Sequence, residues 1–221
     1  GGDLNALFGI AGFAGGIGFG TIFLKKGYSL QRTYALSKLE SAMMPAIQVG
    51  LLVLVVTAPA FIFFSQKGPG AMHAPWLISL AAGLVVGGLS QVSRLCTVGG
   101  FRDLFLFKKS ILIFGYLAVL IGVFVVNISF GNFHLGFENQ PIAHTDGLWN
   151  FLGMALAGFC SVLLGGCPLR QLIMTGEGNS DSAVTVLGLA AGAAFAHNFG
   201  LAASGAGPTL NGEIAVGVGF V

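Results

Sequence analysis

Two cysteines stand beside arginines at breaks in an otherwise apolar chain of 221 residues. Cys96 lies in SRLCTVGGFRD, which also holds Arg102, and Cys167 lies in GGCPLRQ, which also holds Arg170. Glycine and proline release backbone N–H groups from a helix, and free N–H groups at a helix start attract anions. A thiol at such a break is a soft, polarisable contact. The pattern predicts a site for a small anion, and the alternative is that both cysteines are merely small buried residues.

Three further residues are candidates for the same path. Cys160 precedes Cys167 by seven residues and shares its helix face if the helix continues that far. The alternative is again a small buried cysteine. His197 and Asn198 interrupt the apolar run AFAHNFGLA, where an ionisable side chain usually faces a cavity or another helix. Either they join the path, with His197 as a proton relay, or they make an interhelical hydrogen bond.

The charged residues near the breaks also have structural alternatives. Arg102 and Arg170 attract an anion, or they lie at the membrane interface, with Arg102 paired to Asp103. Glu177 and Asp181 are expected to cap the helix that follows them. The sequence has no Walker motif, HExxH or haem CxxCH, and no histidine at zinc spacing from the cysteines. We therefore expect no metal, no cofactor and no enzymatic activity.

The composition indicates a membrane protein. Apolar residues make up 55% of the chain, charged residues only 8%, and the mean hydropathy is +0.87. A soluble domain carries about 25% charged residues, so this chain cannot cover a globule with polar surface. The net charge of +2 gives no indication of nucleic-acid binding. The expected environment is the lipid bilayer.

Six segments are apolar enough and long enough, or nearly so, to cross a bilayer, which takes about 20 residues. They are residues 4–24, 43–65, 76–93, 110–130, 148–164 and 183–203. Basic residues gather in alternate loops, those of Lys25, Arg102 and Arg170, whereas residues 131–147 contain no Lys or Arg. The positive-inside rule places the basic loops in the cytoplasm and residues 131–147 outside. We therefore expect a multi-pass protein of the inner membrane.

An internal repeat relates the two cysteine breaks. Gly87 matches Gly158, Ser90 matches Ser161, and Cys96 matches Cys167, all at an offset of 71 residues. One copy lies within residues 76–130 and the other within residues 147–203, and both point the same way because two spans separate them. The N-terminus also resembles the stretch after Cys167. This likeness indicates that residue 1 follows a lost break, which would lie three spans from Cys96 and in inverted orientation.

The expected fold follows from these patterns. It is one all-α transmembrane domain over residues 1–221, with about six spanning helices and short broken or re-entrant helices at the Gly/Cys breaks. Residues 1–75 would be spans left over from a missing N-terminal half. Inverted repeats with broken helices are typical of secondary transporters, so the chain is predicted to be half of one.

Several longer motifs resemble the YeeE/YedE membrane proteins, a family of sulfur transporters whose known activity is thiosulfate uptake. They are SRLCTVGGFRD, FHLGFENQPIAHTDGLWNFLG, GGCPLRQLIMTGEGNSDSAVTVLG and AFAHNFGLA, within the C-terminal 130 or so residues. The chain is most similar to the YedE branch of proposed selenium transporters. The resemblance implies an inverted-repeat transporter whose pore cysteines hydrogen-bond a sulfur-containing anion, a role that falls by motif on Cys96 and Cys167. Family members carry an N-terminal half with its own cysteine breaks, which this sequence lacks.

The sequence thus favours a membrane transporter for a small sulfur or selenium anion. Arg102 and Arg170 attract the anion, and the two thiols hand it from one constriction to the next. A cytoplasmic sulfur-carrier protein is a candidate partner. One alternative is a membrane-embedded carrier enzyme, with Cys167 as a persulfide-forming nucleophile and His197 as its base. The other is a structural subunit of a membrane complex.

Overall fold

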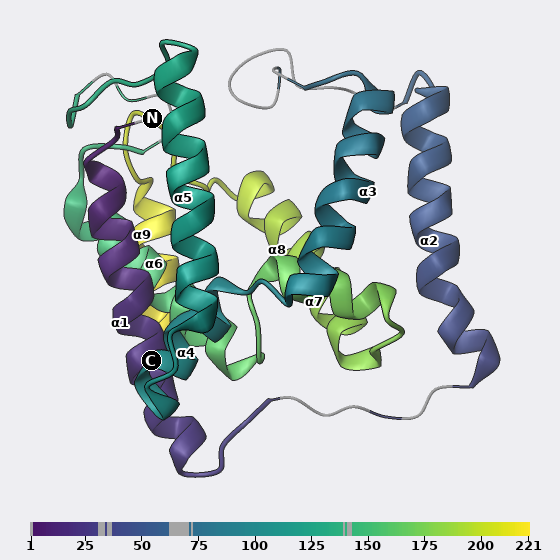
Figure 1. Ribbon diagram of the computed structural model, residues 1–221, viewed down its shortest axis with the longest axis horizontal. Coiled ribbons are helices and arrows are strands. Elements are labelled where there is room, and N and C mark those ends of the chain that lie inside the picture. Colours follow the sequence, from purple (N-terminus) through teal and green to yellow (C-terminus); the bar gives the residue numbers. More distant parts are fainter. Residues whose placement is uncertain are drawn as a thin grey trace.

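The chain folds into a series of helices in a computed structural model (Figure 1). The structure describes residues 2–30, 34, 37–61, 71, 73–138, 140 and 143–221. Within these ranges the helices are α1 (Asn5–Lys25), α2 (Lys38–Thr57), α3 (Trp76–Ser93), α4 (Thr97–Phe107), α5 (Ile111–Ser129), α6 (Gly147–Leu163), α7 (Pro168–Gly176), α8 (Ser180–Asn198) and α9 (Leu210–Gly219). The expected all-α class is confirmed for this part of the chain. Its β-structure is limited to two isolated β-bridges.

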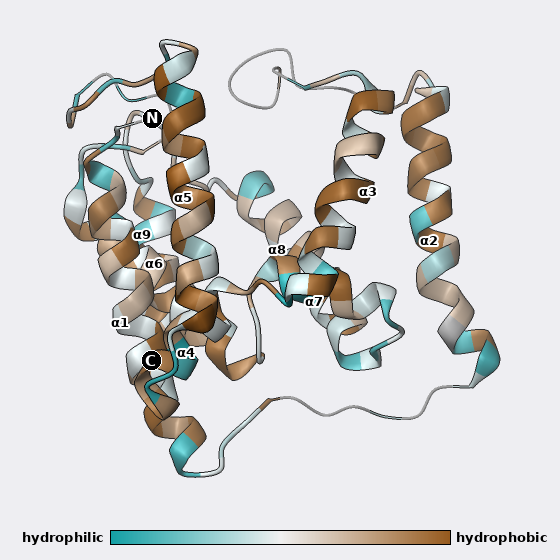
Figure 2. Cartoon of the chain, viewed as in Figure 1, coloured by the Kyte–Doolittle hydropathy of each residue, from teal (hydrophilic) through white to brown (hydrophobic). Residues whose placement is uncertain are grey.

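Five stretches of the described residues are long and apolar enough to cross a membrane. They are Asn5–Lys25, Lys38–Thr57, Trp76–Phe107, Ile111–Ser129 and Gly147–Gly176. Hydrophobic residues cover most of α3 and α5 (Figure 2), and α5 has no buried residue. These outward apolar faces suit a lipid environment, because hydrocarbon tails replace water around them.

Two expected spans differ from the helices observed. The second helix begins at Lys38 rather than residue 43, because Ser37 and Glu40 form a capping box at its start. It ends at Thr57, where Ala58 turns left-handed before Pro59, and residues 62–65 of the expected span lie outside the described residues. The sixth expected span corresponds to α8, which is not among the five candidates. Its ends carry the polar residues Asp181, His197 and Asn198, which shorten the apolar stretch.

Glycines let α1 and α6 approach until their backbones touch. A Cβ atom on Gly12 would lie 2.1 Å from the carbonyl oxygen of Phe151, and one on Gly16 would lie 1.9 Å from that of Ala155. Both distances are impossible for a side chain, so these positions admit only glycine at the present spacing. Small residues four apart are a common way for membrane helices to pack closely. This packing brings Ile17 of α1 and Val162 of α6 into one buried cluster.

The helices form two groups, and at each of the two cysteines the chain passes from one group to the other. The helices α1, α4, α5, α6 and α9 pack on one another, and α7 packs against α2, α3 and α8. Figure 1 shows the first group at the left, α2 and α3 at the right and α7 and α8 between them. Cys96 joins α3 to α4, and Cys167 joins α6 to α7. Each cysteine therefore stands where the chain passes from one group to the other.

The break before α7 has a well-defined geometry. Gly165, with φ of 86°, donates to the carbonyl of Val162, and Gly166 donates to that of Ser161, which is a Schellman motif. The buried Gln171 side chain donates to the carbonyl of Leu164 at 2.9 Å. The carbonyls released at the end of α6 thus find donors within the protein.

The break before α4 resembles the break before α7. The two breaks are separated by 71 residues, which is the offset of the sequence repeat. Arg94 stands 71 residues before Gly165 and is also left-handed, with φ of 52°. The helices α3 and α6 begin at residues 76 and 147, and α4 and α7 begin at residues 97 and 168, so each pair of starts is also 71 apart. These spacings support the proposed repeat. The division at residues 75, 130 and 147 and the inverted relation to a missing half stay predictions.

Candidate functional site

The two cysteine breaks meet in the interior. The backbone N–H of Cys167 donates to the sulfur of Cys96 across 3.4 Å, and the N–H of Gly99 donates to the same sulfur at 3.2 Å. Both cysteines are buried, each with 6% of its surface exposed. The two breaks, 71 residues apart in sequence, thus lie next to one another in the structure. A cavity between them, and passage of a substrate along them, stay predictions.

Each cysteine is the N-cap residue of a short helix. Cys96 caps α4 through its sulfur, and Cys167 precedes α7, whose first residue is Pro168. The Cys167 thiol lies beside the Cys96 thiol, the Thr97 hydroxyl and the backbone N–H groups of Thr97 and Arg170. Two helix N-termini therefore point at one pair of sulfur atoms. Their dipoles favour negative charge at that point.

An apolar shell surrounds the thiols. Ile17 of α1, Val98 of α4 and Val162 of α6 are almost completely buried against them. Phe13, Phe101, Phe159 and Leu169 pack on this cluster from outside. A site that offers N–H groups and sulfur within an apolar shell suits an anion with a soft, weakly hydrated end. Hydrogen bonds to thiols are weak, so such a site also releases what it binds.

Arg170 lies in a small polar network next to this cluster. Its guanidinium donates to the Gln91 side chain of α3 at 3.4 Å and forms an ion pair with Glu177 at 3.6 Å. The Gln91 amide in turn donates to the Glu177 carboxylate, which closes the network. Arg170 is therefore held by two side chains that sequence reasoning did not assign to it.

The expected cap of α8 is partly wrong. Asn179, rather than Glu177 or Asp181, accepts from the N–H of Ser182 and caps the helix. Glu177 bonds to Arg170 and Gln91 instead, while Asp181 lies in the first turn of α8. An anionic side chain in the first turn stabilises the helix by interacting with its dipole, without making a cap hydrogen bond.

Arg102 makes a local pair. Its guanidinium bonds to the Asp103 carboxylate at 2.9 Å, and both side chains are partly exposed. This is the structural alternative that the sequence offered. The ion pair joins two adjacent residues of α4, and Arg102 lies six residues after Cys96. A role in attracting an anion stays a prediction.

Cys160, His197 and Asn198 do not join the buried pair. The helix α6 ends at Leu163, so the helix does not continue to Cys167, and Cys160 is exposed. His197 and Asn198 are also exposed, near the end of α8. The Asn198 amide donates to the carbonyl of Ala194 in its own helix rather than across to another. Any part that these residues take in transport stays a prediction.

Thr97 and Gln91 are site residues that the sequence reasoning missed. Thr97 follows Cys96 directly, so its N–H is free as soon as Cys96 is recognised as an N-cap. Gln91 follows Ser90, which is one of the repeat positions. Its place next to a repeat position could have marked Gln91 as a candidate site residue. Nothing in the sequence joins Gln91 to Arg170, because the pairing depends on how α3 meets α7. In the described part of the chain, no group of three or more His, Cys, Asp or Glu side chains could hold a metal ion.

These features, a thiol pair at paired helix breaks inside an all-helical membrane protein, agree with the comparisons. The family model for sulphur transport matches residues 92–211, more than half of the chain, which therefore belongs to the sulphur transport family. The chain is 30% identical over 111 residues to the thiosulfate transporter TsuA of Escherichia coli strain K12. That match covers 48% of this chain and 30% of TsuA. No solved structure matches.

Proposed function

We propose that this chain carries a small sulfur-containing anion such as thiosulfate across the inner membrane, with Cys96 and Cys167 as its contact points. The observation that carries the proposal is the meeting of both cysteines at the starts of α4 and α7. The similarity to a thiosulfate transporter supports the same substrate class. A selenium-containing anion presents a similarly polarisable selenium atom and is the alternative substrate.

In this proposal the two ends of the anion contact different groups of the protein. Oxygens that carry charge accept from N–H groups at the helix starts, where Gly99 and Thr97 lie. The soft terminal sulfur contacts the thiols of Cys96 and Cys167. An anion bound this way displaces the hydrogen bond between the Gly99 N–H and the Cys96 sulfur. Restoring that hydrogen bond after passage helps to expel the anion.

Arg170 is proposed to hold the anion after it leaves the thiols. The positive-inside rule puts Arg170 on the cytoplasmic side, where a guanidinium binds an oxyanion with two parallel hydrogen bonds. Glu177 and Gln91 already occupy that guanidinium. The carboxylate therefore competes with the anion and assists its release to the cytoplasm, where a sulfur-carrier protein is a candidate acceptor. Arg102 attracts the anion only as far as its pair with Asp103 allows.

Cellular uptake tests the proposal. Cells that lack other thiosulfate and selenite importers are supplied with ³⁵S-thiosulfate or ⁷⁵Se-selenite, with and without the protein. Uptake that depends on the protein and saturates with the anion supports transport. A covalent persulfide trapped on Cys167, without uptake, supports the carrier-enzyme alternative. If a correctly inserted protein gives neither uptake nor a persulfide, the structural-subunit alternative remains.

A further inference from the structure

A buried glutamine, Gln171, lies in α7 four residues after Cys167. Only 2% of its surface is exposed. Burying an amide costs free energy unless hydrogen bonds replace those to water. The transport proposed above does not use this side chain, so its place beside the thiol site calls for another role.

The Gln171 side chain joins the two ends of the break between α6 and α7. Its Nε2 donates to the carbonyl of Leu164 at 2.9 Å, and Leu164 is the residue at which α6 ends. Its backbone N–H donates to the carbonyl of Cys167 at 3.0 Å, as part of the first turn of α7. Residues 164–167 therefore form a closed loop, and both ends of this loop are bonded to Gln171.

Two glycines make this loop intrinsically flexible. Gly165 has φ of 86°, and Gly166 leads directly into Cys167. Glycine has the widest choice of backbone conformations, so two in succession leave the loop free to move unless another group holds it. Cys167 does not hold the loop through its sulfur, since no side-chain cap hydrogen bond forms at the start of α7. The bond from the Gln171 side chain supplies that hold.

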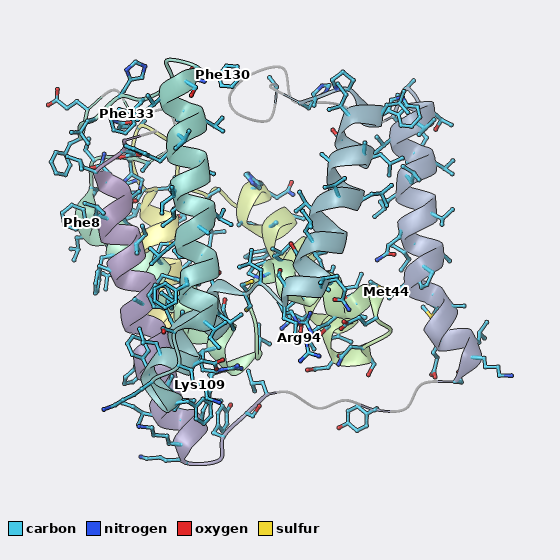
Figure 3. All side chains as sticks on the ribbon, viewed as in Figure 1. Phe8, Met44, Arg94, Lys109, Phe130 and Phe133 are labelled. Atoms are coloured by element: carbon cyan, nitrogen blue, oxygen red, sulfur yellow. The ribbon has the colours of Figure 1, made fainter. Side chains whose placement is uncertain are left out.

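The matching break before α4 has neither the two glycines nor the amide. Arg94 and Leu95 occupy the places of the glycines, 71 residues earlier, and Figure 3 shows Arg94 at the end of α3, where this helix meets α7. Gly100 likewise occupies the place of Gln171 and has no side chain. There the sulfur of Cys96 is fixed by a backbone N–H of α4 at 3.2 Å. The amide thus occurs in the copy whose loop is flexible and whose sulfur makes no cap bond.

Movement of the loop would displace Cys167 from the other thiol. The backbone N–H of Cys167 donates to the Cys96 sulfur across 3.4 Å, and a hydrogen bond weakens steeply when its alignment is lost. Because Cys167 follows the loop directly, the loop sets where its N–H and its thiol lie.

We infer that Gln171 is a positioning residue, whose amide fixes Cys167 opposite Cys96 and thereby sets the affinity of the site for the anion. The inference rests on the proposed function, in which both thiols contact the anion. Gln171 itself does not touch the anion. Its amide holds the loop in one arrangement before the anion arrives, so that binding does not have to order the loop.

Uptake kinetics of Gln171→Met test the inference. Methionine has a similar length and suits a buried position, but it has no donor for the Leu164 carbonyl. We expect the KM for ³⁵S-thiosulfate to rise about fivefold or more, with a smaller change in the maximal rate. Thr175→Val is the matched control, because Thr175 is also buried in α7 and its hydroxyl donates to the Gln171 carbonyl at 2.8 Å rather than to the loop. Thr175→Val should leave the KM unchanged.

The reactivity of Cys167 gives a readout that does not depend on transport. Purified protein in detergent is labelled with N-ethylmaleimide, and mass spectrometry of the peptides separates Cys167 from Cys96. We expect Cys167 to react about threefold faster or more in Gln171→Met, because the freed loop opens locally. In Thr175→Val it should react at the rate of the wild type.

An unchanged KM or an unchanged labelling rate in Gln171→Met would overturn the inference. Equal changes in Thr175→Val would also overturn it, since they would assign the effect to a general loss of stability. If Gln171→Met does not fold, Gln171→Leu takes its place, and failure of both to fold while Thr175→Val folds would assign Gln171 to folding alone. If the wild-type protein takes up no thiosulfate, the proposed function fails, and the labelling rate still decides whether Gln171 positions Cys167.

Discussion

The sulfur of Cys96 accepts a hydrogen bond from the backbone N–H of Cys167, although 71 residues separate them. The bond joins the start of α4 to the start of α7, and thereby the two groups of helices between which the chain crosses. A sulfur atom at this place can contact an anion that enters between the groups. A break in one copy of the proposed repeat is thus completed by the break in the other.

Replacing Arg170 tests whether the guanidinium binds the anion. We expect near-zero uptake for Arg170→Ala and partial uptake for Arg170→Lys, because lysine keeps the charge and loses the planar fork. Both proteins should insert normally. The accessibility of a cysteine introduced at the exposed Gly176 reports whether they do. Uptake by Arg170→Lys equal to the wild type, with misinsertion of Arg170→Ala, would mean that Arg170 only sets the topology.

Replacing Glu177 tests its competition with the anion. In Glu177→Gln the guanidinium loses its ionised partner, so we expect the KM for thiosulfate to fall several-fold and the maximal rate to fall as release slows. Asp181→Asn removes the same charge from the same region without touching Arg170 and is the matched control. Equal effects in the two variants would show a general effect of charge rather than competition at Arg170.

The contact between α1 and α6 predicts a sharp difference between adjacent glycines. Gly16→Ala places a methyl group 1.9 Å from the carbonyl oxygen of Ala155, whereas Gly15→Ala meets only the Phe151 ring at 4.0 Å. We expect Gly16→Ala to lower the free energy of unfolding by about 2 kcal/mol through overpacking. Gly15→Ala should be neutral or slightly stabilising. Thermal unfolding in detergent measures both, and equal midpoints would contradict the packing described here.

The left-handed backbone of Arg94 predicts which residues its position tolerates. Arg94→Gly should change the free energy of unfolding by less than about 1 kcal/mol and keep the break, because glycine adopts φ of 52° without strain. Arg94→Val should lower it by about 1–2 kcal/mol, since a left-handed conformation is costly for a branched residue. The same detergent unfolding experiment applies. Loss of stability in Arg94→Gly as large as in Arg94→Val would instead assign the effect to the guanidinium.

The breaks were predictable from the sequence because glycine, proline and cysteine mark them locally. Cys96 and Cys167 are indeed the N-cap residues of short helices, and the family follows from motifs around them. Five of the six expected spans correspond to candidate spanning stretches. The sixth fails on its polar ends, at Asp181 and Asn198.

Contacts between distant helices were not predictable. The pairing of Arg170 with Glu177 and Gln91 depends on how helices meet, which no local pattern records. Gly12, Gly16 and Gly20 do recur every four residues, a usable signal for a packed face. That signal does not say which helix the face contacts, and α6 is identified only by the structure.

Uptake of ³⁵S-thiosulfate by cysteine variants tests the central claim most directly. Cys96→Ser and Cys167→Ser keep a polar atom of similar size at each break, so the fold should survive while the soft contact is lost. At equal membrane abundance we predict uptake below about one tenth of the wild type for each. The exposed Cys160→Ser should stay within about twofold of it. Uptake in Cys96→Ser and Cys167→Ser that matches the wild type would contradict the claim that the two thiols carry the anion.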